Sequence, residues 1–136
     1  MDIALCVYDE NLKIISFAGA KNPVYYVQNK KLKQIAGAKS PIGGRWQNNE
    51  EDRIFETHTI QINEPTTFFL CTDGYQDQFG GKNGKKLMKK KMKSLFEEIA
   101  ELEDNKQKEK LEDYFFNWKK EEEQVDDVLV MGFKVG

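Results

Sequence analysis

Hydrophobic residues recur along this chain with two different periods, and the change between them divides it into two parts. Up to about residue 72, short apolar runs of strand length alternate with turn-forming residues. These runs predict strands over residues 3–8, 12–18, 24–27, 54–62 and 66–72, with turns at 9–11 and 29–31 and a loop from Pro41 to about Asp52. The run from Ile3 to Tyr8 is apolar on both faces, which is typical of a strand that is covered on both sides.

After Gly80 and Gly81 the apolar positions take the spacing of a helix. The helical face is formed by residues separated by 4, 3, 4 and 3 positions, namely Met88, Met92, Leu95, Ile99 and Leu102. This repeat covers barely two heptads, so an ordinary core-facing helix is favoured over a coiled coil. A second helix is predicted around Leu111, Tyr114, Phe115 and Trp118, and a final strand over residues 128–135. Strands, then two helices, then one strand predict an α+β fold, with an antiparallel sheet and helices packed on one face.

The composition is that of a single polar domain. The chain has 136 residues, of which 32% are charged and 39% hydrophobic, a length at which one domain buries its own core. The net charge of −2 provides no general attraction to nucleic acid or to an anionic membrane. No apolar run approaches the roughly 20 residues of a membrane-spanning helix, and no signal peptide opens the chain. We therefore expect a cytoplasmic protein without membrane or nucleic-acid contacts.

Two apolar runs meet acidic residues at one end. Asp73 and Gly74 follow the run 68–71, and Asp126 and Asp127 precede the run 128–130. A strand end holds a carboxylate oxygen in place, and Mg²⁺ or Mn²⁺ binds several such oxygens at roughly 2.0–2.2 Å. Two carboxylates that converge without a basic partner repel each other unless a cation lies between them. The alternative is that Asp73 and Gly74 form an ordinary strand-ending turn and that Asp126 leads from a loop into a strand.

Other reactive side chains have simpler explanations. His58 is the only histidine and shares a strand face with Ile60 and Ile62, so we expect a partly buried, structural imidazole. The lack of a second histidine and of a Cys–His cluster argues against zinc. Cys6 and Cys71 lie in apolar runs and are expected to be buried, reduced thiols, unless their strands are neighbours and allow a disulfide.

A lysine-rich segment follows the glycines. Residues 82–93 contain seven lysines and no acidic residue. A solvated helix face is the ordinary explanation, but cations at the start of a helix oppose its dipole, which leaves attraction to a phosphorylated partner or substrate as the alternative. No aromatic residues interleave the lysines, which weakens a nucleic-acid interpretation. The glycines at 80, 81 and 84 do not form the Gly-x-x-x-x-Gly-Lys-Ser/Thr pattern of a P-loop.

Five short motifs occur in an order that resembles a known family. They are Asp2-Ile3-Ala4-Leu5, the segment 17–23, Pro41-Ile42-Gly43-Gly44, the segment 72–81 and Gln124-Val125-Asp126-Asp127. This succession resembles the C-terminal portion of the bacterial metal-dependent (PPM-type) serine/threonine protein phosphatases of the stage II sporulation protein E family. The resemblance covers essentially the whole chain. It implies one incomplete half of an α/β/β/α sandwich, in which two antiparallel sheets are flanked by helices.

The resemblance also implies a chemistry. In the family a two-metal site with Mn²⁺ or Mg²⁺ lies at one edge of the sandwich. By resemblance its ligands here are Asp73, within the motif Thr72-Asp73-Gly74, and Asp126. Asp127 is the neighbouring candidate. The implied reaction removes phosphate from phosphoserine or phosphothreonine through in-line attack by a metal-bound hydroxide. The implied partners are phosphorylated proteins of the anti-sigma-factor antagonist type, in signalling that regulates sigma factors.

The chain departs from the family in one respect. It lacks the earlier Asp-x-x-Gly-His-Gly type of segment, whose acidic residue bridges the two metals. We therefore expect the N-terminal part of the catalytic domain to be absent and the fragment alone to be inactive. Two functions stay open, namely an incomplete piece of a phosphatase domain and a non-catalytic module that binds phosphoproteins.

The missing part has a consequence for the surface. Strands that the family covers on a second side would here expose apolar residues, namely Ile3, Leu5, Val7, Val24, Val27, Val128, Val130 and Phe133. Large exposed apolar patches seldom persist on a soluble monomer, so a two-fold homodimer through these strands is expected. The alternative is that the helices between Lys85 and Lys120 cover this face.

Overall fold

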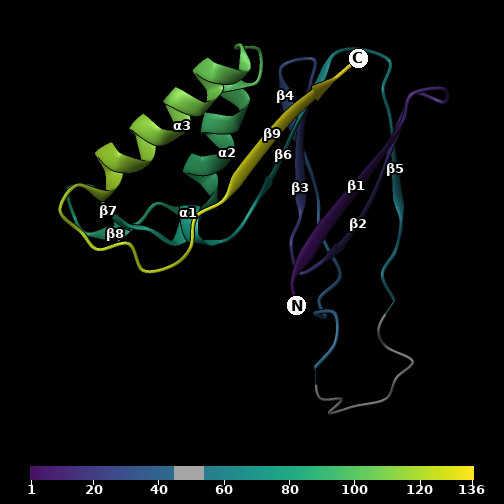
Figure 1. The fold of residues 1–136 in the computed structure, drawn as a ribbon. Helices are drawn as coiled ribbons and strands as arrows, with labels where there is room; N and C mark the ends of the chain where they lie inside the picture. Colours follow the sequence, from purple (N-terminus) through teal and green to yellow (C-terminus); the bar gives the residue numbers. More distant parts are fainter. Residues whose placement is uncertain (45–53) are drawn as a thin grey trace.

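Two antiparallel sheets form the centre of the protein, which is described for residues 1–44 and 54–136 by a computed structural model (Figure 1). The first sheet has the order β1-β2-β5 and contains β1 (Ile3–Asp9), β2 (Ile14–Ala20) and β5 (His58–Gln61). The second sheet has the order β4-β3-β6-β9 and contains β4 (Lys31–Ile35), β3 (Val24–Gln28), β6 (Thr66–Cys71) and β9 (Val130–Val135). All pairs within the two sheets are antiparallel, as predicted.

The helices lie on the side of the second sheet that faces away from the first sheet (Figure 1). They are α1 (Gly74–Asp77), α2 (Met88–Ile99) and α3 (Asp104–Lys119). A two-stranded hairpin of β7 (Phe79–Gly80) and β8 (Lys85–Lys86) connects α1 to α2. The layers therefore run helices, sheet, sheet, which confirms the predicted α+β fold. None of the helices among the described residues is long and apolar enough to cross a membrane.

One core lies between the two sheets. It is built from alternate residues of facing strands, namely Ile15, Phe17, Val24, Ile60, Ile62 and Phe68. The ring of Phe68 stacks between those of Tyr26 and Phe133, with centroid distances of 5.5 and 5.2 Å. His58 lies at the margin of this core, half-buried and stacked at 6.3 Å on Phe17, which agrees with a structural role.

A second core lies between the second sheet and the helices. Phe69 is fully buried there, and its ring stacks on Phe96 of α2 at 4.4 Å. The predicted helical face is confirmed for its three central members, since Met92, Leu95 and Ile99 are all buried. Met88, by contrast, begins the helix and is 59% exposed. Three of the seven lysines, Lys82, Lys85 and Lys86, precede α2 and belong to the hairpin segment rather than to the helix.

The predicted bounds of three strands were wrong. The structure has Ile14–Ala20, His58–Gln61 and Val130–Val135 in place of 12–18, 54–62 and 128–135, and backbone competition explains the second case. The predicted strand 54–62 begins only at His58, because the position beside the end of β2 is taken by the loop after β4. Ala38 there donates its backbone N–H to the carbonyl of Gly19 at 2.7 Å and accepts from the N–H of Lys21 at 2.7 Å. The predicted loop 41–52 is described only as far as Gly44, and its remainder lies outside the described residues.

The expected exposure was correct for β1 and wrong for β3. Leu5 and Val7 are 54% and 57% exposed, so the outer face of β1 is uncovered, although the sequence pattern predicted cover on both sides. Val24 and Val27 are buried, because the first sheet covers one face of β3 and the helices cover the other. Val128, Val130 and Phe133 are half-buried against the two cores. The exposed residues next to and within β9 are instead Leu129 and Met131.

Candidate metal centre

The end of β6 is held against the segment that leads into β9. The hydroxyl of Thr72 donates to the carbonyl of Asp127 at 3.1 Å and accepts from the backbone N–H of Leu129 at 3.0 Å. The backbone N–H of Thr72 donates to the carbonyl of Leu129 at 3.1 Å. The side-chain hydroxyl of Thr72 takes the place of a backbone carbonyl in these hydrogen bonds, so the regular pairing of the two strands ends here. β9 therefore begins at Val130 rather than at residue 128.

Gly74 allows the two segments to approach more closely than a side chain would permit. A Cβ atom at this position would collide with the carbonyl oxygen of Asp127, and Gly74 itself is buried. Asp73 stands between Thr72 and Gly74, with its side chain exposed, and its carbonyl accepts from the N–H of Asp77 at 3.0 Å. The sequence segment 72–74 and the pair Asp126-Asp127 therefore meet at one edge of the second sheet.

Asp126 and Asp127 occupy a constrained turn. The Oδ1 atom of Asp126 accepts from the backbone N–H of Asp127 at 2.7 Å, and its carbonyl accepts from the side-chain amide of Gln124 at 2.9 Å. Both aspartates are exposed. Asp126 therefore presents its second carboxylate oxygen without a protein hydrogen bond among the described residues, which is the state in which a carboxylate can bind a cation.

The donor set at this edge suits a hard cation but is incomplete. Exposed carboxylates and backbone carbonyls are the oxygen ligands that Mg²⁺ and Mn²⁺ prefer. The described parts of the chain nevertheless contain no group of three or more His, Cys, Asp and Glu side chains that could hold a metal ion together. The residues present thus fit part of such a site, and the assignment of Asp73, Gly74, Asp126 and Asp127 to one cation stays a prediction.

Cys71 lies directly behind this edge. Burial raises the pKa of its thiol to about 12, while the positive charge of Lys89 lowers the pKa and the negative charge of Asp73 raises it. Its Sγ atom faces the sulfur of Met92 at 4.0 Å. Burial likewise raises the pKa of Cys6 to about 11. Both cysteines are free and lie in different sheets, so they form no disulfide with each other, and both are half-buried rather than buried as expected.

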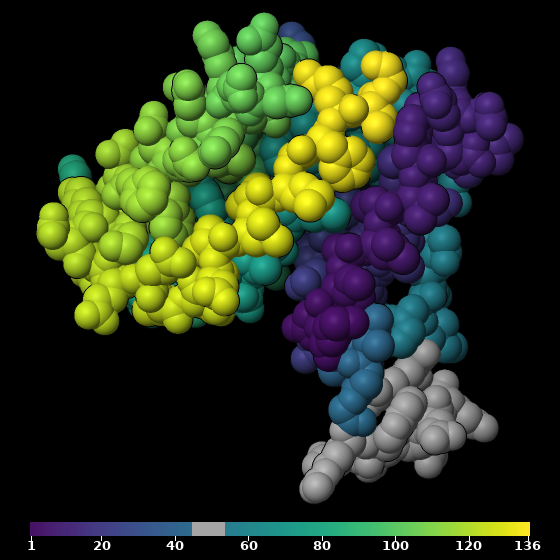
Figure 2. Space-filling model, viewed as in Figure 1, coloured from purple at the N-terminus to yellow at the C-terminus, as the bar shows by residue number. Residues whose placement is uncertain are grey.

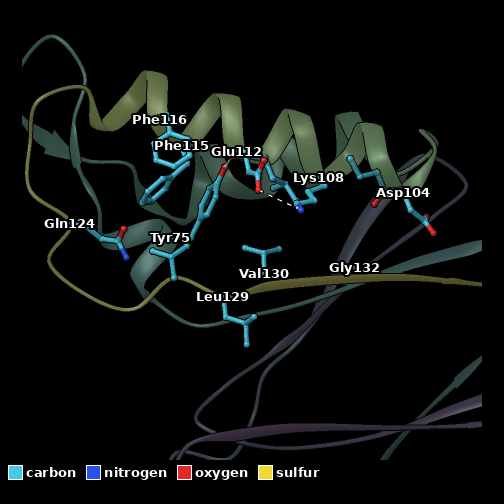
Figure 3. Close-up of a pocket in the computed structure, with 13 residues that line it drawn as sticks. Tyr75, Asp104, Lys108, Glu112, Phe115, Phe116, Gln124, Leu129, Val130 and Gly132 are labelled. Atoms are coloured by element: carbon cyan, nitrogen blue, oxygen red, sulfur yellow. Dashed lines mark hydrogen bonds and ion pairs between the residues drawn. The ribbon is translucent and has the colours of Figure 1, made fainter.

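A pocket of about 470 Å³ lies beside the edge, between α3 and β9 (Figure 3). Tyr75 reaches from α1 to α3, where its hydroxyl donates to the carbonyl of Leu111 at 2.8 Å and its ring packs on Phe115 at 5.2 Å. Val130 points from β9 toward α3, whereas Leu129 points away from it (Figure 3). Burial raises the pKa of Tyr75, so this hydroxyl stays protonated and holds α1 against α3.

The comparisons with known proteins identify the family and the fold of this chain. Residues 1–136 match the family described as stage II sporulation protein E (SpoIIE). The chain belongs to the stage II sporulation protein E family. Among curated proteins, none matches the chain.

Solved structures of related domains have the same fold. The SiaA-PP2C domain of Pseudomonas aeruginosa is 25% identical and superposes with a TM-score of 0.89, over 99% of this chain and 52% of that one. The phosphatase domain of SpoIIE from Bacillus subtilis is 13% identical, with a TM-score of 0.68, over 98% of this chain and 57% of that one. A longer SpoIIE structure, with the PP2C phosphatase domain and a fragment of the regulatory domain, gives 18% identity and a TM-score of 0.70. This chain therefore has the fold of PP2C-type phosphatase domains and spans about half the length of the domains that it matches.

Two residues that organise this part of the SpoIIE-family fold were missed by sequence reasoning. Thr72 was treated as part of a motif, but its hydroxyl is the atom that joins the two acidic segments. Gln78 is fully buried, and its side-chain amide donates to the carbonyls of Phe79 and Glu123 at 3.0 and 2.9 Å. A single glutamine at the end of a four-residue helix gives no periodic signal, so only the structure reveals its role.

Proposed function

We propose that this chain contributes metal ligands to a phosphoserine/phosphothreonine protein phosphatase domain, with Asp73 and Asp126 binding Mn²⁺ or Mg²⁺. The observation that carries the proposal is the junction of segment 72–74 with Asp126 and Asp127, in a chain that belongs to the stage II sporulation protein E family. One of the related SpoIIE structures is of a Mn-presoaked domain, which supports manganese as the first ion to test.

Each residue at the junction has a separate task in this proposal. Thr72 holds the start of β9 at a fixed distance from the end of β6 through its two hydrogen bonds. Gly74 leaves room for the carbonyl of Asp127, and the hydrogen bond within Asp126-Asp127 orients the Asp126 carboxylate. A pair of divalent ions, if bound there, would supply an activated water and neutralise phosphoryl charge. The chain's own contribution is to keep two carboxylates aligned for that purpose.

The fragment alone should turn over phosphoesters negligibly. Each missing carboxylate removes both negative charge and a coordination position, so two ligands bind a divalent ion weakly. The substrates we propose for the complete domain are phosphorylated proteins of the anti-sigma-factor antagonist type, dephosphorylated in the cytoplasm as part of sigma-factor regulation. The fold and family support a phosphatase, and the identity of the substrate class is part of the proposal.

A phosphatase assay on two forms of the protein tests this function. Residues 1–136 and the full-length product of the natural gene are incubated with phosphoserine and phosphothreonine peptides at millimolar Mn²⁺. We expect turnover only from a product that supplies the further ligands, and we expect Asp73→Asn to abolish it while Asp113→Asn, an exposed aspartate on α3, leaves it unchanged. Robust turnover by residues 1–136 that is abolished by Asp73→Asn would show that the site is complete in this chain. Equal activity of Asp73→Asn and the unsubstituted intact protein would refute the proposed role of Asp73.

The second candidate is a non-catalytic module that binds phosphoproteins. It is favoured by the absence of a three-ligand group among the described residues. The same experiment separates the two functions, because a binding module would retain phosphopeptides without releasing phosphate in either form of the protein.

A further inference from the structure

Five lysines line one pocket on the hairpin side of the helices. This pocket, which we name the lysine pocket, has a volume of about 720 Å³. Its lining includes Lys82, Lys85, Lys86, Lys90, Lys91 and Trp118. The first three lysines come from the hairpin segment, Lys90 and Lys91 come from the first turn of α2, and Trp118 comes from the end of α3. The hairpin segment and α2 thus bring positive charge to one cavity, which α3 borders with Trp118, in a chain whose net charge is −2.

Most of this charge is not neutralised within the protein. Lys86 forms an ion pair with Asp77 at 3.4 Å, on the side of the pocket that adjoins α1. Among the described residues, Lys82, Lys85, Lys90 and Lys91 have no carboxylate within 4.0 Å. Like charges gathered at this spacing repel one another, so the cluster opposes folding rather than supporting it.

Helix stability does not explain the cluster either. The first turn of α2 contains no acidic residue, and its lysines lie at the end where the helix dipole is already positive. The dipole therefore adds to the lysine charges instead of offsetting them. A cluster that is unfavourable for the free protein in both respects is well suited to a ligand that carries several negative charges.

The walls of the lysine pocket are rigidly connected. The indole N–H of Trp118 donates to the carbonyl of Gln78 at 3.0 Å, and the N–H of Gly81 donates to the carbonyl of Trp118 at 2.8 Å. The N–H of Leu87, just before α2, donates to the same carbonyl of Gln78 at 2.9 Å. A single residue, Gln78, thus ties the hairpin, α2 and α3 together, so the lysines are presented on a preorganised frame.

The aromatic rings near the lysine pocket distinguish between two classes of anionic partner. The ammonium group of Lys91 lies 3.9 Å from the centroid of the Trp118 ring, and that of Lys86 lies 5.8 Å from the Phe79 ring. Ring faces that are covered by lysines cannot stack on nucleic-acid bases, which is the main source of single-strand binding besides charge. The cationic surface is also short, because a carboxylate oxygen of Glu122 borders the hairpin, 4.0 Å from the Cβ position of Gly84.

We propose that the lysine pocket binds an aspartate- and glutamate-rich segment of a protein partner. Carboxylates on successive side chains of such a segment can each meet one ammonium group, whereas the bordering Glu122 limits the length of anion that fits. The pocket adjoins α1, whose Asp77 is paired with Lys86, so a partner bound there lies next to the edge that carries Asp73. This binding requires neither a metal nor a phosphoester, and it therefore stands or falls independently of the proposed phosphatase function.

Fluorescence of Trp118 provides a direct test. The chain has two tryptophans, and Trp46→Phe leaves Trp118, which is fixed by its bond to Gln78, as the only reporter. An oligo-glutamate peptide is titrated into this protein at low salt, without metal. We expect a saturable change in Trp118 emission whose affinity falls as ionic strength rises, because exposed charge pairs are screened by salt.

Matched charge variants identify the pocket as the binding site. In the Trp46→Phe background, Lys82→Gln, Lys85→Gln and Lys90→Gln together should weaken peptide binding about tenfold, since each exposed ion pair contributes little by itself. The control removes the same charge elsewhere, with Lys31→Gln, Lys106→Gln and Lys110→Gln at exposed positions, and should change affinity less than about twofold.

Three results would overturn the proposal. They are an absence of peptide binding at low salt, an equal loss of affinity in the pocket and control variants, and tighter binding of a single-stranded oligonucleotide of equal charge that is lost in the pocket variant. The last result would assign the pocket to nucleic acid instead of an acidic protein segment. Circular dichroism of both variants confirms that the fold is retained.

Discussion

Strands β1 and β6 are both rich in apolar residues but lie in very different environments. Both are apolar runs without polar alternation, and both would be predicted to be covered on two faces. In β6, Phe68 faces the first sheet and Phe69 faces the helices, and both are fully buried. In β1, the inner face contacts the sheet core, whereas Leu5 and Val7 on the outer face are more than half exposed. The hydrophobic pattern thus indicates which faces of a strand are apolar. The topology decides whether another element of this chain packs on those faces.

The same difference extends to the sheet edges. β6 lies between β3 and β9, while β1 and β9 are edge strands of their respective sheets. Figure 2 shows both edge strands, β1 in purple and β9 in yellow, at the surface on the same face of the molecule. Leu129 and Met131, beside and within β9, are 57% and 51% exposed. The uncovered apolar surface therefore lies on the side of the sandwich where both sheets end.

The largest effect on stability is expected from shortening one large apolar side chain in each of the two strands. Phe69→Ala should lower the free energy of unfolding by about 3–5 kcal/mol, because it empties the stacked position against Phe96. Leu5→Ala should lower it by no more than about 0.5 kcal/mol, because little of that side chain is buried. Urea unfolding followed by circular dichroism measures both, at a protein concentration low enough for light scattering to show only the monomer. Similar losses for the two variants would mean that the outer face of β1 is covered in solution.

A smaller effect is expected where the end of β6 meets the start of β9. Gly74→Ala places a methyl group against the carbonyl of Asp127, which the backbone can relieve only by moving, at a cost of about 1–3 kcal/mol. Gly132→Ala is the matched control, since a Cβ there would lie 3.4 Å from the side chains of Gln107 and Phe69, an ordinary contact. Amide chemical shifts should move at Asp127 and Leu129 only in the first variant. Unchanged shifts at Asp127 would contradict the close approach of the two segments.

Substitutions on the outer face of β1 should change stability least but should change the oligomeric state clearly. We expect the chain to self-associate as a two-fold dimer that buries Leu5 and Val7, and we expect Leu5→Lys with Val7→Lys to keep it monomeric at the same concentrations. Light scattering across a concentration series distinguishes these states. A protein without substitutions that stays monomeric at high concentration would rule out the dimer. The helices do not compete for this face, because they cover the other sheet.

Long, periodic elements could be predicted from the sequence, and short ones could not. The 4-3 spacing from Met92 to Ile99 identified α2 because it repeats over several turns. The helix α1 and the strands β7 and β8 contain four and two residues each, too few for any period to emerge. The approach of segment 72–74 to Asp127 followed from their places at strand ends, but the Thr72 hydroxyl that joins them depends on a side-chain rotamer. The exposure of Leu5 depends on whether another element packs on the outer face of β1, and the local sequence pattern does not contain that information.

Binding of Mn²⁺, followed residue by residue, tests the central claim that Asp73 and Asp126 face one cation. Mn²⁺ is paramagnetic and broadens the NMR signals of nearby amides. With only part of a ligand set, we expect binding on the order of millimolar. The signals of Asp73, Gly74, Asp126 and Asp127 should broaden first, and Mg²⁺ should restore them. Either Asp73→Asn or Asp126→Asn should abolish the effect, while Asp113→Asn, at an exposed position of α3, should not. Broadening that begins instead at the acidic run 121–123, or that persists unchanged in Asp73→Asn, would contradict the account.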